Sequence, residues 1–477
     1  MKLTFLFSLF AGLMLGTLLA HAAPDRTRPN FILIMVDDMG YSDIGCYGGE
    51  VKTPNLDKLA KDGLRFTQFY NTAKCHTTRA ELLTGNYAYS IGDNNMEHGA
   101  TFGEVLRLIG YRTLIAGKWH QKPLPTTRGF DRYYGHCGSL DMAPYVWVDT
   151  GKVTALPDRM EGVTSKEDRY GWYRKGPMGS DFHIDEVLPH LFDKSIAYVK
   201  EQAKTKKPFF LYLPLPAPHT PIVPVPPYKD ASKINPYADF VMQMDGHVGD
   251  LLATIKEAGV DENTLVFFTS DNGCSPQGNF ELLKEFGHDP SAGYRGHKAD
   301  VYEGGHRVPF IARWPKGIKA GQKTNALACL TDLYDTMREI TGQPTKANGG
   351  EDSFSLLPVF KGKESTGRTT LVSHSIGGSF SIRQGDWKLC LSAGSGGWSA
   401  PRETEAKKKK LPPIQLFDLK KDRGERKNLL ATNRPKANEL ILLLSKEVKH
   451  GRSSVSYTHL RAHETREDLV CRLLLEK

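Results

Sequence analysis

Four short apolar runs, each followed by polar side chains, constrain the fold of this chain more than any other feature. Each run has the length of a β-strand. Continuous apolar runs are typical of strands buried on both faces, which are usually parallel and covered by helices. The runs and the side chains after them are 31–36 before Asp37 and Asp38, 111–116 before Lys118 and His120, 209–213 before His219, and 265–269 before Asp271 and Asn272.

Helix signals between these runs complete an alternating α/β pattern. Thr53 and Pro54 are typical of an N-cap and first helical residue, and Thr101 with Glu104 predicts a capping box. A third helix is expected over residues 237–258. Because ligands of open α/β sheets bind beyond the carboxyl ends of the strands, the four polar sets are predicted to share one site.

From about residue 367 the sequence pattern changes. Residues 379–391 and 414–419 form short or alternating runs separated by turn residues, and an amphipathic helix closes the pattern near Val448. We therefore predict a catalytic domain over 28–366 and a C-terminal subdomain of antiparallel sheet plus helix over 367–450. Residues 451–477 continue no pattern, and we expect this tail to lie outside the native fold.

The N-terminus resembles a secretory signal peptide. Lys2 precedes an apolar run over residues 3–19, and Ala20-His21-Ala22 supplies a small-x-small cleavage site. A membrane anchor is the alternative, since the run is nearly long enough to span a bilayer. The cleavage site and the turn residues at 24–26 favour removal of residues 1–22. We expect a secreted or periplasmic protein with no stable membrane anchor.

The net charge limits the binding partners that we expect, and the cysteine count limits the disulfides. The formal net charge of +9 favours anionic ligands such as sulfated glycans. Part of this charge is the lysine run 407–410, which lacks the interleaved aromatics of single-strand binding, so no nucleic-acid partner is expected. Seven cysteines do not make a disulfide scaffold in a chain of this size, and the odd count leaves at least one thiol unpaired, for which Cys75 is the candidate.

The segment Cys75-His76-Thr77-Thr78-Arg79 resembles the maturation motif of the type I sulfatases, in which the cysteine is oxidised to formylglycine by a maturation enzyme. The usual Pro or Ala at the third position is Thr77 here. Alone, Cys75 reads as a buried or disulfide-bonded cysteine. Further motifs occur in the family's order: Asp37-Asp38-Met39-Gly40-Tyr41, Gly117-Lys118-Trp119-His120, Pro218-His219-Thr220-Pro221, Ser270-Asp271-Asn272-Gly273 and Glu303-Gly304-Gly305-His306-Arg307-Val308-Pro309.

This resemblance implies an alkaline phosphatase-like α/β fold with a large mixed, mostly parallel sheet. It implies a bound Ca²⁺, with Mg²⁺ as the alternative ion, and oxygen ligands suit such a hard cation. Each acidic pair alone is also a common turn sequence. The implied metal ligands are Asp37, Asp38, Asp271, Asn272 and the modified side chain at Cys75.

The resemblance also implies catalytic roles. One hydroxyl of the hydrated formylglycine attacks sulfur, while Lys118 and Lys298 stabilise the sulfate oxygens. His219 protonates the departing alcohol, and His120 helps to deprotonate the second hydroxyl, which expels sulfate. Arg79 is expected on the same helical face as Cys75, holding the hydrate. For Lys298, the nearby Arg295 and His297 are competing candidates.

The substrate class remains open at the level of sequence. Aromatic residues within 141–183 offer surface for stacking on sugar rings, although such residues also pack insertion loops. A sulfated carbohydrate or aryl sulfate is expected. The alternatives are a phosphoester or phosphonate hydrolase of the same superfamily, and a catalytically silent glycan-binding protein with unmodified Cys75. The aromatic members of the segment, with one histidine, are Tyr145, Trp147, Tyr170, Trp172, Tyr173 and His183.

Overall fold

The computed structural model describes residues 28–165, 168–343 and 349–450. The predicted signal peptide at 1–22 and the predicted tail at 451–477 lie outside these residues. Within the described ranges, no helix combines the length and the apolar character that crossing a membrane requires.

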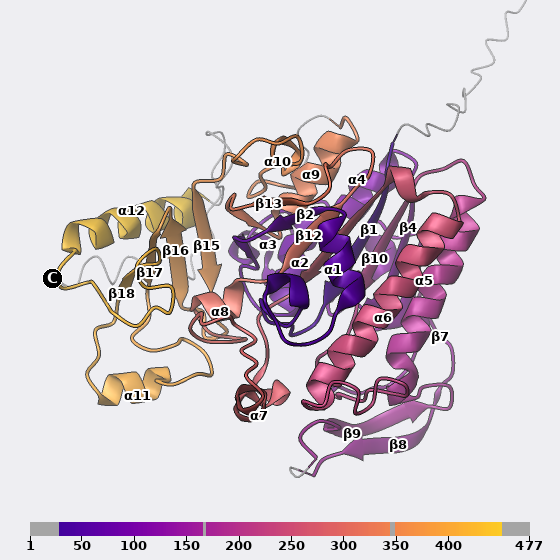
Figure 1. Ribbon diagram of the computed structural model, residues 1–477, viewed down its shortest axis with the longest axis horizontal. Helices are drawn as coiled ribbons and strands as arrows, with labels where there is room; N and C mark the ends of the chain where they lie inside the picture. The colour runs from indigo at the N-terminus through magenta and orange to yellow at the C-terminus, as the bar shows by residue number, and fades with distance from the viewer. Residues whose placement is uncertain (1–27, 166–167, 344–348, 451–477) are drawn as a thin grey trace, which may run out of the picture.

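A ten-stranded mixed sheet forms the centre of the molecule (Figure 1). The four predicted strands are neighbours in its parallel central part, and antiparallel pairs occur toward both edges, which confirms the predicted fold class. In sheet order the strands are β13 (Gln322–Thr324), β2 (Leu64–Phe66), β12 (Phe310–Arg313), β11 (Thr264–Ser270), β1 (Asn30–Val36), β10 (Phe209–Pro214), β4 (Arg112–Lys118), β5 (Arg132–His136), β6 (Val148–Asp149) and β7 (Lys152–Val153).

Helices cover both faces of this sheet, as continuous apolar strands require. Alternate residues of β1 point to opposite faces, so that Phe31, Leu33 and Met35 join one apolar cluster, and Ile32, Ile34 and Val36 join the other. The first cluster includes residues of α2 (His76–Thr84), α4 (Phe102–Leu108) and α9 (Asp332–Ile340); the second includes residues of α1 (Pro54–Lys61), α5 (Val187–Ala203) and α6 (Pro236–Glu257).

The predicted helices begin where the sequence signals place them, and one of the two predicted caps is present. Thr101 and Glu104 form the predicted capping box of α4. Pro54 is the first residue of α1, but the Thr53 hydroxyl accepts the backbone N–H of Gly45 and caps nothing. Asn235, which the sequence analysis did not single out, caps α6 by accepting the backbone N–H of Ala238.

A second, four-stranded antiparallel sheet follows near the C-terminus, beside α8 (Glu303–His306) in Figure 1. Its strands, in order, are β15 (Thr370–His374), β16 (Phe380–Gln384), β17 (Trp387–Cys390) and β18 (Gln415–Asp418), and α12 (Arg434–His450) packs on them. The remaining elements are β3 (Phe69–Tyr70), α3 (Ala88–Ile91), β8 (Pro157–Val163), β9 (Tyr173–Gly179), α7 (Phe280–Glu285), β14 (Ala328–Cys329), α10 (Leu357–Phe360) and α11 (Glu403–Lys408).

Buried charges join this C-terminal sheet to the main body. The Lys388 ammonium on β17 lies 3.1 Å from the Glu303 carboxylate and 3.0 Å from that of Glu425. Burial opposes ionisation of Glu303, but Lys388 and Arg383 outweigh it and hold the pKa of that carboxyl well below its usual range. The contact fixes α8, and with it the turn after β11, because Gly273 donates its backbone N–H to Gly305.

The aromatic segment 141–183 mostly packs on itself. Tyr145 and Trp147 are buried in a cluster with Phe182, and Tyr173 joins the same cluster. Tyr170 and Trp172 are only half-buried. Packing therefore accounts for most of the aromatic surface that the sequence offered for sugar stacking.

Candidate active site

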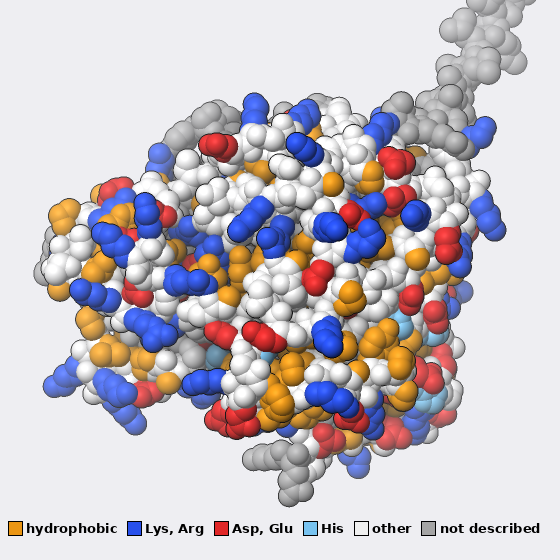
Figure 2. All heavy atoms as spheres, viewed as in Figure 1, with side chains coloured by type: hydrophobic (Ala, Val, Ile, Leu, Met, Phe, Trp, Pro, Cys, Tyr) orange, Lys and Arg blue, Asp and Glu red, His pale blue; other side chains and the backbone are white. Residues whose placement is uncertain are grey.

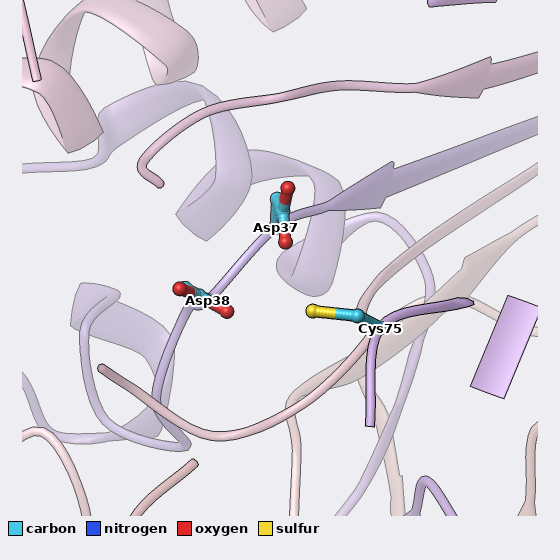
Figure 3. A group of neighbouring side chains, drawn as sticks. All are labelled: Asp37, Asp38 and Cys75. Carbon is cyan, nitrogen blue, oxygen red and sulfur yellow. The ribbon is translucent and has the colours of Figure 1, made fainter. Parts of the chain in front are cut away.

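The carboxyl ends of β1, β10, β4 and β11 bring the predicted polar residues together. Asp37 and Asp38 follow β1, and Lys118 is the last residue of β4, two residues beyond the predicted run. Figure 3 shows the side chains of Asp37, Asp38 and Cys75 converging from two segments of the chain. One potential ligand atom from each lies within 4.8 Å of the others, and all three residues are buried.

Cys75 sits at the N-cap position of α2. Its backbone N–H donates to Asn272 Oδ1 at 3.1 Å, and its Sγ lies 3.5 Å from the same oxygen. The Asn272 side-chain amide also donates to Asp38 Oδ1 at 2.7 Å. The turn after β11 therefore positions both the cysteine and one carboxylate. This turn requires Gly273, because a Cβ there would clash with the Gly304 carbonyl oxygen.

Each carboxylate of the cluster pairs with one buried cation. Lys118 Nζ lies 2.5 Å from Asp37 Oδ2, and Lys298 Nζ lies 2.5 Å from Asp38 Oδ1. Burial opposes both charges. At Asp37, Lys118 is the main group that outweighs burial, and it holds the pKa of the Asp37 carboxyl well below its usual range. At Lys298, Asp38 outweighs burial and raises the pKa of the ammonium.

The structure distinguishes Lys298 from its two competitors. Arg295 stacks on the Tyr302 ring, 3.9 Å from its centroid, and donates to the Glu425 carbonyl oxygen. The His297 ring packs at 5.2 Å from that of Phe280. Of the three, only Lys298 forms an ion pair with Asp37 or Asp38.

Arg79 lies on α2 with its guanidinium completely buried. Its Nη2 and Nε lie 2.8 Å and 3.1 Å from Asp271 Oδ2, and Nη2 lies 3.9 Å from Asp37 Oδ1. Burial, with repulsion from Asp37, raises the pKa of Asp271 to about 6 despite Arg79. The arginine therefore orients a carboxylate, a contact that the predicted hydrate-holding role did not include.

The residues fit a hard divalent cation. Asp37 Oδ1 is buried and has no hydrogen-bond partner among the described residues. Because buried polar atoms are normally paired, this oxygen suits the binding of a cation. Asp38, Asp271 and Asn272 add further oxygens in the same cluster. Six to eight oxygen ligands are typical of Ca²⁺, and fewer protein oxygens with water are typical of Mg²⁺.

The two predicted histidines flank the cluster. His219 Nδ1 lies 2.6 Å from the Thr220 carbonyl oxygen, to which it donates, and Nε2 lies 3.6 Å from Asp38 Oδ2. The His120 ring packs 5.3 Å from that of His76, and His120 Nδ1 is buried without a partner among the described residues. Burial lowers the pKa of both rings, helped by Lys298 at His219 and by Lys118 at His120.

Burial also raises the pKa of the Cys75 thiol to about 11, although Lys298 and Lys118 oppose the shift. The unmodified side chain is therefore a neutral thiol at pH 7 in this environment and a weak nucleophile. The described cysteines, including Cys75, are all free thiols.

Sequence reasoning missed several neighbours of the cluster. The Asn71 amide donates to the Asp271 carbonyl oxygen at 2.8 Å, and Gln121 donates to the His76 carbonyl oxygen at 2.8 Å. Trp398 lies against the Lys74 ammonium, 5.2 Å from the ring centroid. Gln121 and Lys74 stand beside predicted residues in the sequence, but nothing local identifies Asn71 or Trp398.

The chain that carries this cluster matches a known protein family. The family model described as Sulfatase matches residues 29–343. The N-acetylgalactosamine-6-O-sulfatase of Bacteroides thetaiotaomicron is 29% identical over 477 residues, covering 87% of this chain and 92% of that protein. Arylsulfatase A of Homo sapiens is 33% identical over 462 residues, covering 88% and 86% respectively.

The fold agrees with these matches. One solved structure, of a Bacteroides thetaiotaomicron protein, is described by the metabolism of multiple glycosaminoglycans in that organism. It superposes on this chain with a TM-score of 0.78 and 27% identity, covering 88% of this chain and 99% of that one. The matched region contains the whole cluster from Asp37 to Lys298. The protein therefore belongs to the sulfatase family and is a sulfuric ester hydrolase.

Proposed function

We propose that the protein is an exported sulfatase that hydrolyses sulfate esters of carbohydrates, with a formylglycine made from Cys75 as the nucleophile and a bound Ca²⁺, or alternatively Mg²⁺. The observation that carries the proposal is the convergence of Cys75 with Asp37 and Asp38, whose carboxylates pair with the buried lysines Lys118 and Lys298. The neutral thiol supports it, because the unmodified side chain offers neither a thiolate nor a hydroxyl.

The proposed cation ligands are Asp37, Asp38, Asp271, Asn272 and the modified side chain at position 75. A divalent ion at these oxygens would supply positive charge to the sulfate group. The hydrated formylglycine would supply two hydroxyls on one carbon, which neither a thiol nor a serine carries.

The chain's own side chains then bind the sulfate and move protons. Lys118 and Lys298, which pair with Asp37 and Asp38, are the cations that would stabilise the oxygens of a sulfate group in the cluster. His219 donates Nδ1–H to the Thr220 carbonyl, which leaves Nε2 facing Asp38 and available to the leaving oxygen. An anionic substrate beside His219 favours its protonated form, which general-acid catalysis requires. His120 keeps a neutral ring that can accept a proton.

The relatives support a carbohydrate substrate. One is named as an N-acetylgalactosamine-6-O-sulfatase, and the formal charge of +9 suits a polyanionic chain. Export is supported by the signal-like sequence of residues 1–22. The predicted units 28–366 and 367–450 remain our assignment of the domain boundary.

Matched esters test the function. Protein co-expressed with a formylglycine-generating enzyme is assayed on the sulfate and phosphate esters of one phenol, and on a panel of singly sulfated sugars. We expect sulfate hydrolysis that Cys75→Ala abolishes. Faster phosphate hydrolysis that survives Cys75→Ala would instead support the phosphoester alternative. Sugar binding without any turnover of converted protein would support a silent glycan-binding protein.

A further inference from the structure

A loop of the C-terminal region is built against the segment that carries Lys298. The fully buried Asp300 carboxylate accepts the backbone N–H groups of Trp398 and Ser399 at 2.8 Å and 3.0 Å. Gly397 permits the close approach, since a Cβ there would clash with the Ala299 carbonyl oxygen. Trp398 is thus fixed to a segment that begins two residues after Lys298.

The same loop is braced from its other side. Glu403, the first residue of α11, accepts the Gly394 backbone N–H at 2.8 Å and the Ser392 hydroxyl at 2.6 Å. Burial opposes its ionisation, but these hydrogen bonds outweigh it and lower the pKa of Glu403. A loop tied at both ends places its tryptophan reproducibly.

Trp398 meets the residue directly before the predicted nucleophile. The Lys74 ammonium lies 5.2 Å from the centroid of the Trp398 ring, and both side chains are half-buried. Burial lowers the pKa of the Lys74 ammonium, and the nearby Asp38 carboxylate opposes this shift. Yet within the described ranges Lys74 has no ion pair, whereas Lys118 and Lys298 each have one.

We propose that Trp398 and Lys74 form a substrate subsite beside Cys75, in which the tryptophan stacks on the sugar ring and Lys74 binds a second anionic group of the same saccharide. The favoured substrate is therefore a sulfated sugar with a second sulfate or a carboxylate. This inference rests on the proposed sulfatase function, because it concerns the same centre.

The chemistry suits both residues. An indole face stacks on the C–H face of a pyranose without needing a particular hydrogen-bond pattern. A lysine without a carboxylate partner can bind a sulfate or carboxylate without first breaking an existing pair. In such a subsite, affinity for the ring depends on Trp398 and selectivity for a dianionic sugar depends on Lys74.

Kinetics on two sugars test the subsite: one pyranose with a single sulfate, and the same pyranose with two. KM is the readout, because it does not depend on how much of position 75 has been converted. Trp398→Ala should raise KM for both sugars about tenfold, and Trp398→Phe should restore most of the loss. Inhibition by inorganic sulfate, which has no ring, should change less than twofold.

Lys74→Gln should raise KM about tenfold for the disulfated sugar alone, and Lys74→Arg should largely restore it. Trp314→Ala is the matched control, since Trp314 is also half-buried and donates its indole N–H to Asn263 Oδ1 at 3.4 Å, just after the end of β12. It should leave both KM values unchanged.

Three results would overturn the proposal: unchanged KM values in Trp398→Ala, an equal effect of Lys74→Gln on both sugars, or an equal loss in Trp314→Ala. Calorimetric binding of the two sugars to the Cys75→Ala protein distinguishes failure of the subsite proposal from failure of the proposed sulfatase function. The Trp398 and Lys74 effects on binding persist there if the subsite exists, whether or not converted protein hydrolyses sulfate esters.

Discussion

Three predicted site residues have a positive backbone φ, which non-glycine residues rarely adopt. Asp38, Cys75 and His120 have φ values of 70°, 44° and 57°. Such conformations cost about 1–3 kcal/mol each in non-glycine residues and cluster at functional sites. The turn after β11 helps to hold two of them, because Asn272 hydrogen-bonds to both Cys75 and Asp38.

Asp271→Ala tests the metal ligands. It removes a charged oxygen ligand and the carboxylate that is hydrogen-bonded to the buried Arg79, so we expect loss of the bound divalent ion, a fall in activity on the order of a hundredfold or more, and a lower Tm. Metal content by mass spectrometry, with activity and Tm, is the measurement. Asp62→Ala, at a partly exposed carboxylate, is the control. A variant that kept its full divalent content would exclude Asp271 as a ligand.

His219→Ala tests the proton donor. Protonation of the leaving oxygen matters most when that oxygen is basic, so kcat/KM should fall far more for alkyl or sugar sulfates than for activated aryl sulfates. His98→Ala, at an exposed histidine, should leave both unchanged. Equal losses on the two substrate types would reject the general-acid role.

Glu81 predicts a pH dependence of stability. Burial raises the pKa of this α2 carboxyl to about 8, against hydrogen bonds from the Thr72 hydroxyl and the Ala88 backbone. The folded state therefore binds one more proton than the unfolded state between the usual carboxyl pKa and about 8. Stability should fall by about 1.4 kcal/mol per pH unit across this window.

Glu81→Gln keeps the shape of the side chain and removes its titration. The unfolding free energy of the variant should therefore fall less steeply with pH, and the variant should become more stable relative to wild type as the pH rises. Urea unfolding at several pH values measures the difference. Parallel curves for the two proteins would show that Glu81 is ionised in the fold.

At the scale of elements, the sequence predicted the strands well and the loops poorly. The central strands begin and end within two residues of the apolar runs, because burial on both faces demands uninterrupted apolar sequence. Lys298 and Trp398 lie on loops whose places depend on contacts between distant segments, such as Asp300 with Trp398. No local pattern encodes such contacts, so the motif resemblance found the first residue and nothing found the second.

Lys388→Met tests how the C-terminal sheet is joined to α8. The change removes the ion-pair partner of the buried Glu425 carboxylate and one of the cations around Glu303, which keeps Arg307 and Arg383. The unfolding free energy should therefore fall by about 3–5 kcal/mol. Urea unfolding measures the loss, and Lys420→Met, at an exposed lysine, is the control. A loss no larger than that of the control would mean that the network does not stabilise this contact.

At the scale of the whole molecule, the main sheet supplies the proposed chemistry and the C-terminal region supplies one wall beside it. Asp37, Cys75, Lys118 and Asp271 all come from strand ends or helix starts of the main body. Figure 2 shows lysine and arginine side chains spread over the visible face, in agreement with the formal net charge of +9.

The state of position 75 tests the central claim most directly. Thr77 replaces the residue usual in the family and lacks the fixed φ of proline, so we expect partial conversion of Cys75 in protein co-expressed with a formylglycine-generating enzyme. Peptide mass spectrometry should show both thiol and aldehyde, and Thr77→Pro should raise the aldehyde fraction. Sulfatase activity should rise in proportion to that fraction across preparations. Fully thiol protein that hydrolysed sulfate esters as fast as converted protein would contradict the account.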